Sequence, residues 1–481
     1  MKAWTRLAAV VTGILLLVAV AAVWIAQSDW LRAKVHNGII EQAEKATGGK
    51  VELGAFRFDW RTLTAEVDRF VIHGTESASD APLLAIDRIT VGLRVISLIG
   101  RDVNVSRVEA EHPQAHVVLY PDGRTNLPQP RTRRTGKPIA ETILDLKIGK
   151  FDLRDGTFFA ESPGQPPRRM PWEAHGNNLA AQMSYDPANR RYSGNLSLAP
   201  LRVESVDFDV AASAAMEPKR ITISNATVRT RESQVDLKDV VIDNFADPVA
   251  NGRYEARVSL DETASIFQLR TRQSGTVYVS GSARYRTPGE YAVDGALHGA
   301  DITYWKLRDM RVVSDVHATP GKIHLSSLHV QALGGEVLAD ADVVDFRHVT
   351  ARGRAERFDL RKTAAIETKK PLPYDGMVSG PFDATIDANR IRVSARLNVA
   401  PAPNGPAARG EVAVRYDSGR KTVELGQSWV ELPNSRIEAS GTLGERLNVK
   451  ADSRDFSDLL PAVDALIPGK PVALSFASAS F

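Results

Sequence analysis

The sequence predicts a mainly β protein, in which one N-terminal transmembrane helix precedes an elongated antiparallel β-sheet with short helices. Three observations predict this fold. An uncharged apolar segment lies near the N-terminus, and apolar and polar residues alternate over most of the remaining chain. Similar segments also recur along the chain at a spacing of about 100 residues.

The uncharged segment spans residues 7–27, with Lys2 and Arg6 before it and Asp29 as the first charge after it. About 20 apolar residues in a helix cross the core of a bilayer, and the positively charged side usually faces the cytoplasm. We therefore predict a cytoplasmic tail over 1–6, a transmembrane helix over 7–27 that stays uncleaved, and a body outside the cytoplasm. A cleaved signal peptide is the alternative, but its apolar core is usually shorter, about 7–15 residues.

A second helical pattern follows the anchor. Leu31, Val35 and Ile39 recur at helical spacing, and Gly48 and Gly49 end the pattern. The sequence therefore predicts a helix over 29–47 that packs against the start of the sheet.

From Gly49 onward the pattern has period two. In residues 391–399 the apolar side chains fall on one face of a strand, and arginine, serine and asparagine fall on the other. Residues 253–260 and 276–285 alternate in the same way. Strands with one apolar and one polar face belong to an antiparallel sheet with one wetted side.

The long-range repeat consists of three segments that begin at Ile221, Ile323 and Val423, each with a strand, a break and a second strand. Each leads to a short helical stretch, predicted at residues 262–269, 360–366 and 456–466. A fixed period is typical of stacked units that bury their apolar surface against their neighbours.

Three stretches share a pattern with a known family. They are the anchor with its helix and the strand pattern after Gly49, residues 82–128 with the motif Asp122-Gly123-Arg124-Thr125-Asn126-Leu127, and residues 147–161. Together they resemble the AsmA-like superfamily of AsmA- and TamB-type proteins. In the last of these stretches, Asp155-Gly156 predicts a turn between two strands. The resemblance implies an inner-membrane-anchored, repeating β-groove protein, with a curled sheet whose concave side is apolar.

The resemblance also implies a domain organisation. Residues 28–130 would form a helix with a first β unit, and residues 131–481 would form groove units of about 100 residues each, the last one incomplete. The side chains expected to line the lipid-binding groove are apolar residues of the alternating segments. They are Val258, Leu260, Val277, Val279, Ile391, Val393, Leu397, Val399, Ile437 and Leu443.

Composition and motifs exclude several functions. The 61 Lys and Arg residues nearly balance 58 Asp and Glu residues, and there is no cysteine, so nothing favours a nucleic-acid partner, a disulfide framework or a thiolate metal site. The phosphate-binding, zinc-protease and serine-hydrolase motifs do not occur in the sequence. We therefore expect no enzymatic activity, no catalytic residues and no cofactor.

The histidines do not predict a metal site either. His112 and His116 are four residues apart, which suits a helix, but they lie in a strand pattern. His324 and His329 are five residues apart, which places them on opposite faces of a regular strand.

The resemblance implies a function in cell envelope biogenesis, as a bridge-like conduit for phospholipid between the inner and outer membranes. The partners would be the inner membrane and phospholipid acyl chains, which gain about 0.8 kcal/mol per buried CH₂. The alternative is a periplasmic scaffold for outer-membrane protein assembly, whose sheet edges hold an outer-membrane protein or barrel by strand addition. A closed, dry β-core would show the same alternation, so the pattern leaves open which apolar face is accessible.

Overall fold

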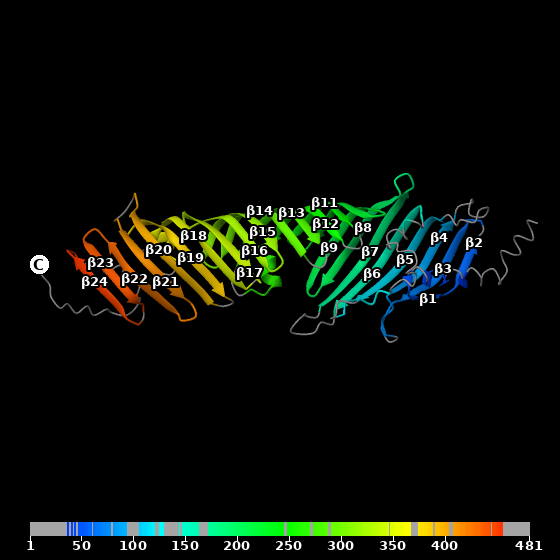
Figure 1. Cartoon of the computed structure of the whole chain (residues 1–481), viewed down its shortest axis with the longest axis horizontal. Coiled ribbons are helices and arrows are strands. Elements are labelled where there is room, and N and C mark those ends of the chain that lie inside the picture. The colour runs from blue at the N-terminus through cyan, green and yellow to red at the C-terminus, as the bar shows by residue number, and fades with distance from the viewer. Residues whose placement is uncertain are drawn as a thin grey trace, which may run out of the picture. The chain divides into compact units, whose positions relative to one another are not determined.

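A computed structural model of the chain describes most of residues 47–455 and part of the helix before them (Figure 1). The described residues are 36–37, 40–41, 43–44, 47–59, 61–77, 80–93, 105–120, 125–128, 144, 147–162, 172–244, 248–269, 273–286, 290–345, 347–366, 374–387, 390–403, 407–443 and 445–455.

The predicted mainly β fold is confirmed. The structure is 76% strand, with 24 strands of largely antiparallel sheet and few helices. One pair departs from the antiparallel pattern, since β5 and β6 run parallel.

The chain divides into two compact units. Unit 1 comprises Met1–Arg231 and Leu237–Pro248, and unit 2 comprises Glu232–Asp236 and Val249–Phe481. The strands of unit 1 are β1 (Lys50–Leu53), β2 (Phe56–Asp59), β3 (Thr64–His73), β4 (Leu84–Leu93), β5 (Val105–Val118), β6 (Lys150–Ser162), β7 (Trp172–Asp186), β8 (Arg191–Val203), β9 (Val206–Glu217) and β10 (Arg220–Arg229).

Strand β11 (Gln234–Asp243) contributes residues to both units. The remaining elements belong to unit 2. They are β12 (Val249–Ser259), α4 (Leu260–Ile266), β13 (Gln273–Arg286), β14 (Glu290–Tyr304), β15 (Leu307–Thr319), β16 (Lys322–Ala332), β17 (Gly335–Val344), β18 (His348–Asp359), α5 (Leu360–Ala364), β19 (Gly376–Asp387), β20 (Arg390–Pro401), β21 (Arg409–Asp417), β22 (Thr422–Glu431), β23 (Ser435–Thr442) and β24 (Leu447–Ser453).

The element order repeats along the chain. Strands β10, β16 and β22 begin at Arg220, Lys322 and Thr422, and α4 and α5 each follow the third strand of such a set. Each helix is capped at its N-terminus by a short polar side chain. The Ser259 hydroxyl accepts a hydrogen bond from the backbone N–H of Glu262, and Asp359 accepts one from Lys362.

The helix before the sheet ends where the sequence predicts. The described residues between His36 and Thr47 are helical, and Gly48 follows with φ of +78°, a conformation that favours glycine. At Gly49 a Cβ atom would lie 2.1 Å from the carbonyl oxygen of His73 in β3. The two glycines therefore end the helix and let the chain enter the sheet beside β3.

Two predicted helices, over 7–27 and 456–466, lie outside the described residues. Within the part of the chain that the structure describes, no helix has the length and apolar character that crossing a bilayer requires.

The prediction of a curled sheet, which the resemblance implies, is wrong, since the sheet in this structure is not curled. Among the described residues of each unit, the extensive strand-to-strand contacts join hydrogen-bonded neighbours. Adjacent strands rotate relative to one another by roughly 20–25°, and bulges add to this rotation. Within each unit, the described strands therefore follow one another as hydrogen-bonded neighbours.

The turn predicted at Asp155-Gly156 is also wrong. Strand β6 runs through both residues, and its pairing with β7 shifts between Leu153 and Gly156. Asp155 has φ of +52°. The dipeptide forms a β-bulge, in which the extra residue is accommodated without reversing the chain.

Asn126, from the stretch that resembles the superfamily, fixes the chain after β5. Its side chain is 0% exposed. Its amide oxygen accepts a hydrogen bond from the N–H of Val118 at 3.0 Å, and its amide nitrogen donates to the carbonyl of His116 at 2.8 Å. Its own carbonyl accepts from the N–H of Thr75 at 2.9 Å, so one residue joins the end of β5 to the segment after β3.

Candidate functional site

The strands of unit 2 align their apolar residues into an unbroken row. Residues that face each other across an antiparallel pair share one face of the sheet, so the register of successive pairs can be followed from β12 to β22. This central row is Tyr254, Gly281, Gly295, Val316, Leu325, Ala341, Ala351, Ala384, Val393, Tyr416 and Val423.

Two flanking rows run beside the central row on the same face. One is Val258, Val277, Gly299, Val312, Val330, Val337, Ala355 and Gly380. The other is Gly252, Ala283, Val293, Ala318, Ile323, Val343, Val349, Ile386 and Ile391. We call the surface made by these three rows the apolar face of unit 2.

Most of the apolar face is only partly shielded from solvent. In the central row Ala341 is buried at 7% exposed, Tyr416 is 40% exposed, and the other members have intermediate exposure. A closed core between two layers would bury most of these side chains, because protein interiors pack without gaps. The face is therefore an accessible apolar surface over most of its described length.

Some of the residues predicted to line a groove belong to the three rows, and the others lie outside them. Val258, Val277 and Ile391 belong to the flanking rows, and Val393 belongs to the central row. Val279 pairs with Ala256 and Leu297, between two rows. Leu260 is the first residue of α4, outside the strand that its alternation suggests.

The remaining predicted residues lie near the end of unit 2. Leu397 pairs with Val412, and Ile437 pairs with Val430. Leu443 follows β23 and is 55% exposed.

A small closed core lies beside α5, outside the three rows. Val399 is 7% exposed and packs with Tyr374, Ala408 and Leu432, and Leu360 of α5 and Ile437 pack against this cluster. Leu360 thus packs against the end of β20 that holds Val399, while Val393, on the same strand, has intermediate exposure.

The opposite face of unit 2 is polar and carries ion pairs between neighbouring strands. The Arg390 side chain donates two hydrogen bonds to Asp417, of 3.0 and 2.5 Å, and the pair holds the pKa of that carboxyl well below its usual range. Hydrogen bonds from the His348 imidazole and, to a smaller extent, from Arg392 lower the pKa of Asp387. These exposed pairs give the second face its charged, water-facing character.

The expectation that His324 and His329 lie on opposite faces is wrong. The pairing of β16 shifts between Leu325 and Leu328, and Ser327 has φ of +52°. This bulge adds one residue to the strand, so the five-residue spacing returns to the same face. Both imidazoles lie on the polar face, where His324 contacts Asp342 at 2.8 Å and His329 contacts Glu336 at 2.7 Å.

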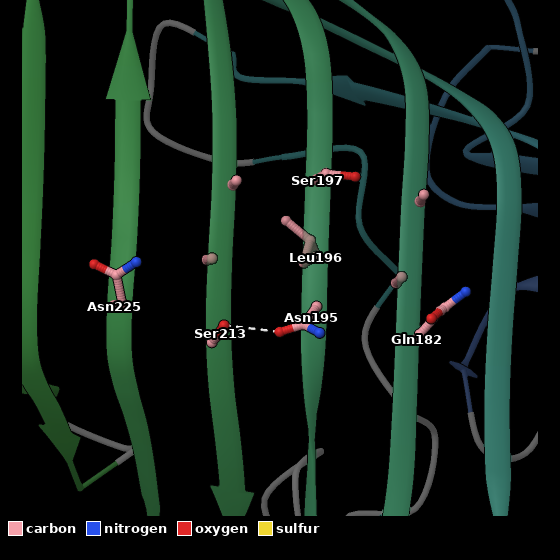
Figure 2. Close-up of a pocket in the computed structure, with 10 residues that line it drawn as sticks. Gln182, Asn195, Leu196, Ser197, Ser213 and Asn225 are labelled. Carbon is pink, nitrogen blue, oxygen red and sulfur yellow. Dashed lines mark hydrogen bonds between the residues drawn. The ribbon is translucent and has the colours of Figure 1, made fainter.

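Unit 1 has an apolar row of its own and a hollow on its polar side. The row is Val67, Ile89, Ala110, Leu153, Ala181, Leu196, Ala212 and Ala226. The hollow, of about 330 Å³, lies over β7–β10, where Gln182, Asn195, Ser213 and Asn225 form a row of uncharged side chains (Figure 2). The Ser213 hydroxyl donates to the Asn195 amide oxygen at 2.7 Å. The residues that line the hollow are uncharged.

The other two histidines considered for a metal site, His112 and His116, each lie beside a different carboxylate. His112 contacts Asp87 at 3.5 Å and His116 contacts Glu161 at 3.2 Å. Among the residues that the structure describes, no group of three or more histidine, aspartate or glutamate side chains is arranged to hold a metal ion.

Sequence reasoning missed most of the central row. Val316, Leu325, Ala341 and Ala351 were not among the expected lining residues, and Val313 and Ser314 interrupt the alternation of residues 312–318. Tyr254 lies in a segment that alternates clearly. Its position beside Gly281 and Gly295, however, depends on the hydrogen-bond register between β12, β13 and β14.

No protein-family model matches the chain, and no curated protein matches it in sequence. A functional proposal for this chain therefore depends on the geometry of the apolar and polar faces of unit 2.

Proposed function

We propose that the chain is a non-enzymatic envelope protein that conducts phospholipid between the inner and outer membranes along the apolar face of unit 2. The observation that carries this proposal is the unbroken central row from β12 to β22, most of which has intermediate exposure. A row of apolar side chains that water can reach gains free energy when acyl chains cover it.

The dimensions of the row suit an acyl chain. Strands lie about 4.8 Å apart, so the eleven strands of the central row span about 48 Å. Two layers of acyl chains make up a bilayer core of ~30 Å, so one chain occupies roughly 15 Å. Several acyl chains would fit in succession along the row, with headgroups left in water.

The N-terminal segment supplies the starting point in this proposal. Residues 7–27 would anchor the chain in the inner membrane, with residues 1–6 in the cytoplasm and the β units in the periplasm. The uncharged run and the flanking Lys2 and Arg6 support this topology. The groove of the AsmA-like superfamily is replaced here by an open apolar face.

A photo-crosslinking experiment on the full-length chain in its native membrane tests the proposal. A photoreactive amino acid is placed at Val393, in the central row, or at the adjacent Ser394, which pairs with Asp383 and Arg415 on the polar face. We expect phospholipid adducts at Val393 and few at Ser394.

Each other outcome counts against lipid conduction. Protein adducts alone at Val393 would favour the scaffold for outer-membrane protein assembly. Equal lipid labelling at the two positions would show that the apolar face has no preference for acyl chains, and an absence of adducts at Val393 would leave that face without an occupant.

A charge substitution tests the same surface independently. Val393→Glu places a carboxylate among Ala384 and Tyr416, where acyl chains would pass. We expect less phospholipid to co-purify with this variant, measured by mass spectrometry, and no loss with Ser394→Glu. Circular dichroism checks that both variants keep their strand content. A folded Val393→Glu variant that retains its full lipid complement would overturn the proposal.

A further inference from the structure

Four side chains from four successive strands form one row on the polar face of unit 2. Asp294 of β14 pairs with His317 of β15, His317 pairs with His324 of β16, and His324 pairs with Asp342 of β17. Directly opposed residues of an antiparallel pair have Cβ atoms about 4.5–5.5 Å apart. The two imidazoles are therefore neighbours, with one carboxylate on the outer side of each.

Each carboxylate holds its histidine by the same ring nitrogen. The Nδ1 atom of His317 lies 2.6 Å from a carboxylate oxygen of Asp294, and the Nδ1 atom of His324 lies 2.8 Å from one of Asp342. A carboxylate on Nδ1 favours the tautomer with the proton on that nitrogen, which leaves the Nε2 lone pair for a ligand. Both imidazoles are open to solvent, at 52% and 41% exposed.

We propose that His317 and His324 together bind one divalent first-row transition-metal ion, such as Cu²⁺, Ni²⁺ or Zn²⁺, through their Nε2 atoms. Metal–imidazole bonds are about 2.0–2.1 Å long, so two nitrogens on a tetrahedral ion lie roughly 3.4 Å apart. Neighbouring Cβ atoms about 5 Å apart allow that separation. Imidazole ligands suit these ions, and Cu²⁺ binds most tightly among them.

The proposed site has two protein ligands, and water completes the coordination. The described residues contain no group of three or more acidic or histidine side chains around a metal position. The two carboxylates act through the histidines, because each is hydrogen-bonded to the imidazole it orients. The negative charge of the two carboxylates favours a cation at this position. Lys322, 3.1 Å from Asp342, reduces the contribution of that carboxylate.

Other histidines of the polar face lack this arrangement. His329 pairs with Val313 and Leu338 across the neighbouring strands. His348 pairs with Val344 and with Asp387, which its imidazole contacts. His348 is therefore a matched control: a histidine held by an aspartate, with no second imidazole opposite.

The test is a titration of the full-length chain, purified without a polyhistidine tag, with Cu²⁺ alone, followed by calorimetry and electron paramagnetic resonance. We expect one site per chain with two nitrogen ligands. His317→Gln or His324→Gln should weaken binding at least about 10-fold and leave one nitrogen ligand, while His348→Gln should leave the affinity unchanged. Asp294→Asn should weaken binding by about 10-fold or more, because it removes the orienting carboxylate.

Two results would overturn the proposal. One is a wild-type titration that matches that of the double variant H317Q/H324Q. The other is an equal loss in His348→Gln, which would show binding by histidines in general. Circular dichroism of each variant distinguishes a lost ligand from a lost fold.

Discussion

The phenolic oxygen of Tyr254 lies over Gly295, two strands away on the apolar face of unit 2. A Cβ atom at Gly295 would lie 2.5 Å from this oxygen and 2.5 Å from the carbonyl oxygen of Ser280. Gly281, between them in the central row, would place a Cβ atom 1.9 Å from the carbonyl of Asp294. Because neither glycine has a side chain, the Tyr254 side chain can lie across both strands close to the backbone.

Gly295→Ala should destabilise unit 2, because the new methyl group meets a backbone oxygen that cannot move without disturbing β13. We expect a loss of about 1–3 kcal/mol in the free energy of unfolding, measured by urea titration with circular dichroism. Gly419→Ala is the control, since its Cβ atom would meet the flexible side chain of Arg390 at 3.1 Å. Equal losses in the two variants would show that the backbone oxygen of Ser280 does not restrict this position.

Tyr254→Phe should leave the stability equal or raise it by up to about 1 kcal/mol. The hydroxyl is buried and makes no hydrogen bond with any described residue, and burial raises the pKa of Tyr254. Tyr192→Phe provides the contrast, because the Tyr192 hydroxyl accepts a hydrogen bond from the N–H of Ile148 at 2.6 Å. That variant should lose about 0.5–1.5 kcal/mol in the same urea titration. The reverse order of stabilities would show that the Tyr254 hydroxyl has a partner.

Asn126→Ala should be among the more damaging single substitutions in unit 1. It removes both side-chain hydrogen bonds and leaves the N–H of Val118 and the carbonyl of His116 without these partners, at a cost of about 1–3 kcal/mol for each group that stays buried. The free energy of unfolding measures the loss. Asn225→Ala, at an exposed asparagine of the same unit, should change it by less than about 0.5 kcal/mol. A similar small change at Asn126 would disprove its role in joining β5 to the segment after β3.

The ion pairs of the polar face predict acid sensitivity of unit 2. Arg390 lowers the pKa of Asp417 in the folded chain, so the folded state binds this proton less readily than the unfolded state does. The resulting stability is present above the unfolded carboxyl pKa of about 3.9 and is lost as the pH falls through the lower folded value. We expect the melting temperature to fall below about pH 4 and Asp417→Asn to flatten this fall. An unchanged slope in that variant would exclude Asp417 as a contributor.

Local patterns accounted for the main elements. Alternation at residues 391–399 predicted a strand with one apolar face, and β20 has that form. Gly48 ends the helix before the sheet because a positive φ suits glycine there. The predicted helix at 360–366 corresponds to α5 at Leu360–Ala364, since Asp359 supplies an N-cap immediately before it.

Local patterns failed where the register changed. The Asp155-Gly156 pair has the composition of a turn, yet its neighbours β5 and β7 hold it within β6 as a bulge. The bulge near Ser327 likewise moved His329 to the face that holds His324. A single added residue reverses the faces of the strand beyond it, and its position depends on the partner strands.

Local sequence patterns predict most strands, the helix ends and the alternation of apolar and polar residues within regular stretches of strand, because these follow from the backbone preferences and hydrophobicity of nearby residues. Which residues lie beside one another, and which face a strand presents beyond a bulge, depends on the tertiary structure. It aligned Tyr254 with Gly281 and Gly295, placed Val393 in the same row, and set His317 opposite His324. These relationships depend on hydrogen-bond register between strands, which is fixed by all the pairings of the sheet together and has no signature within one strand.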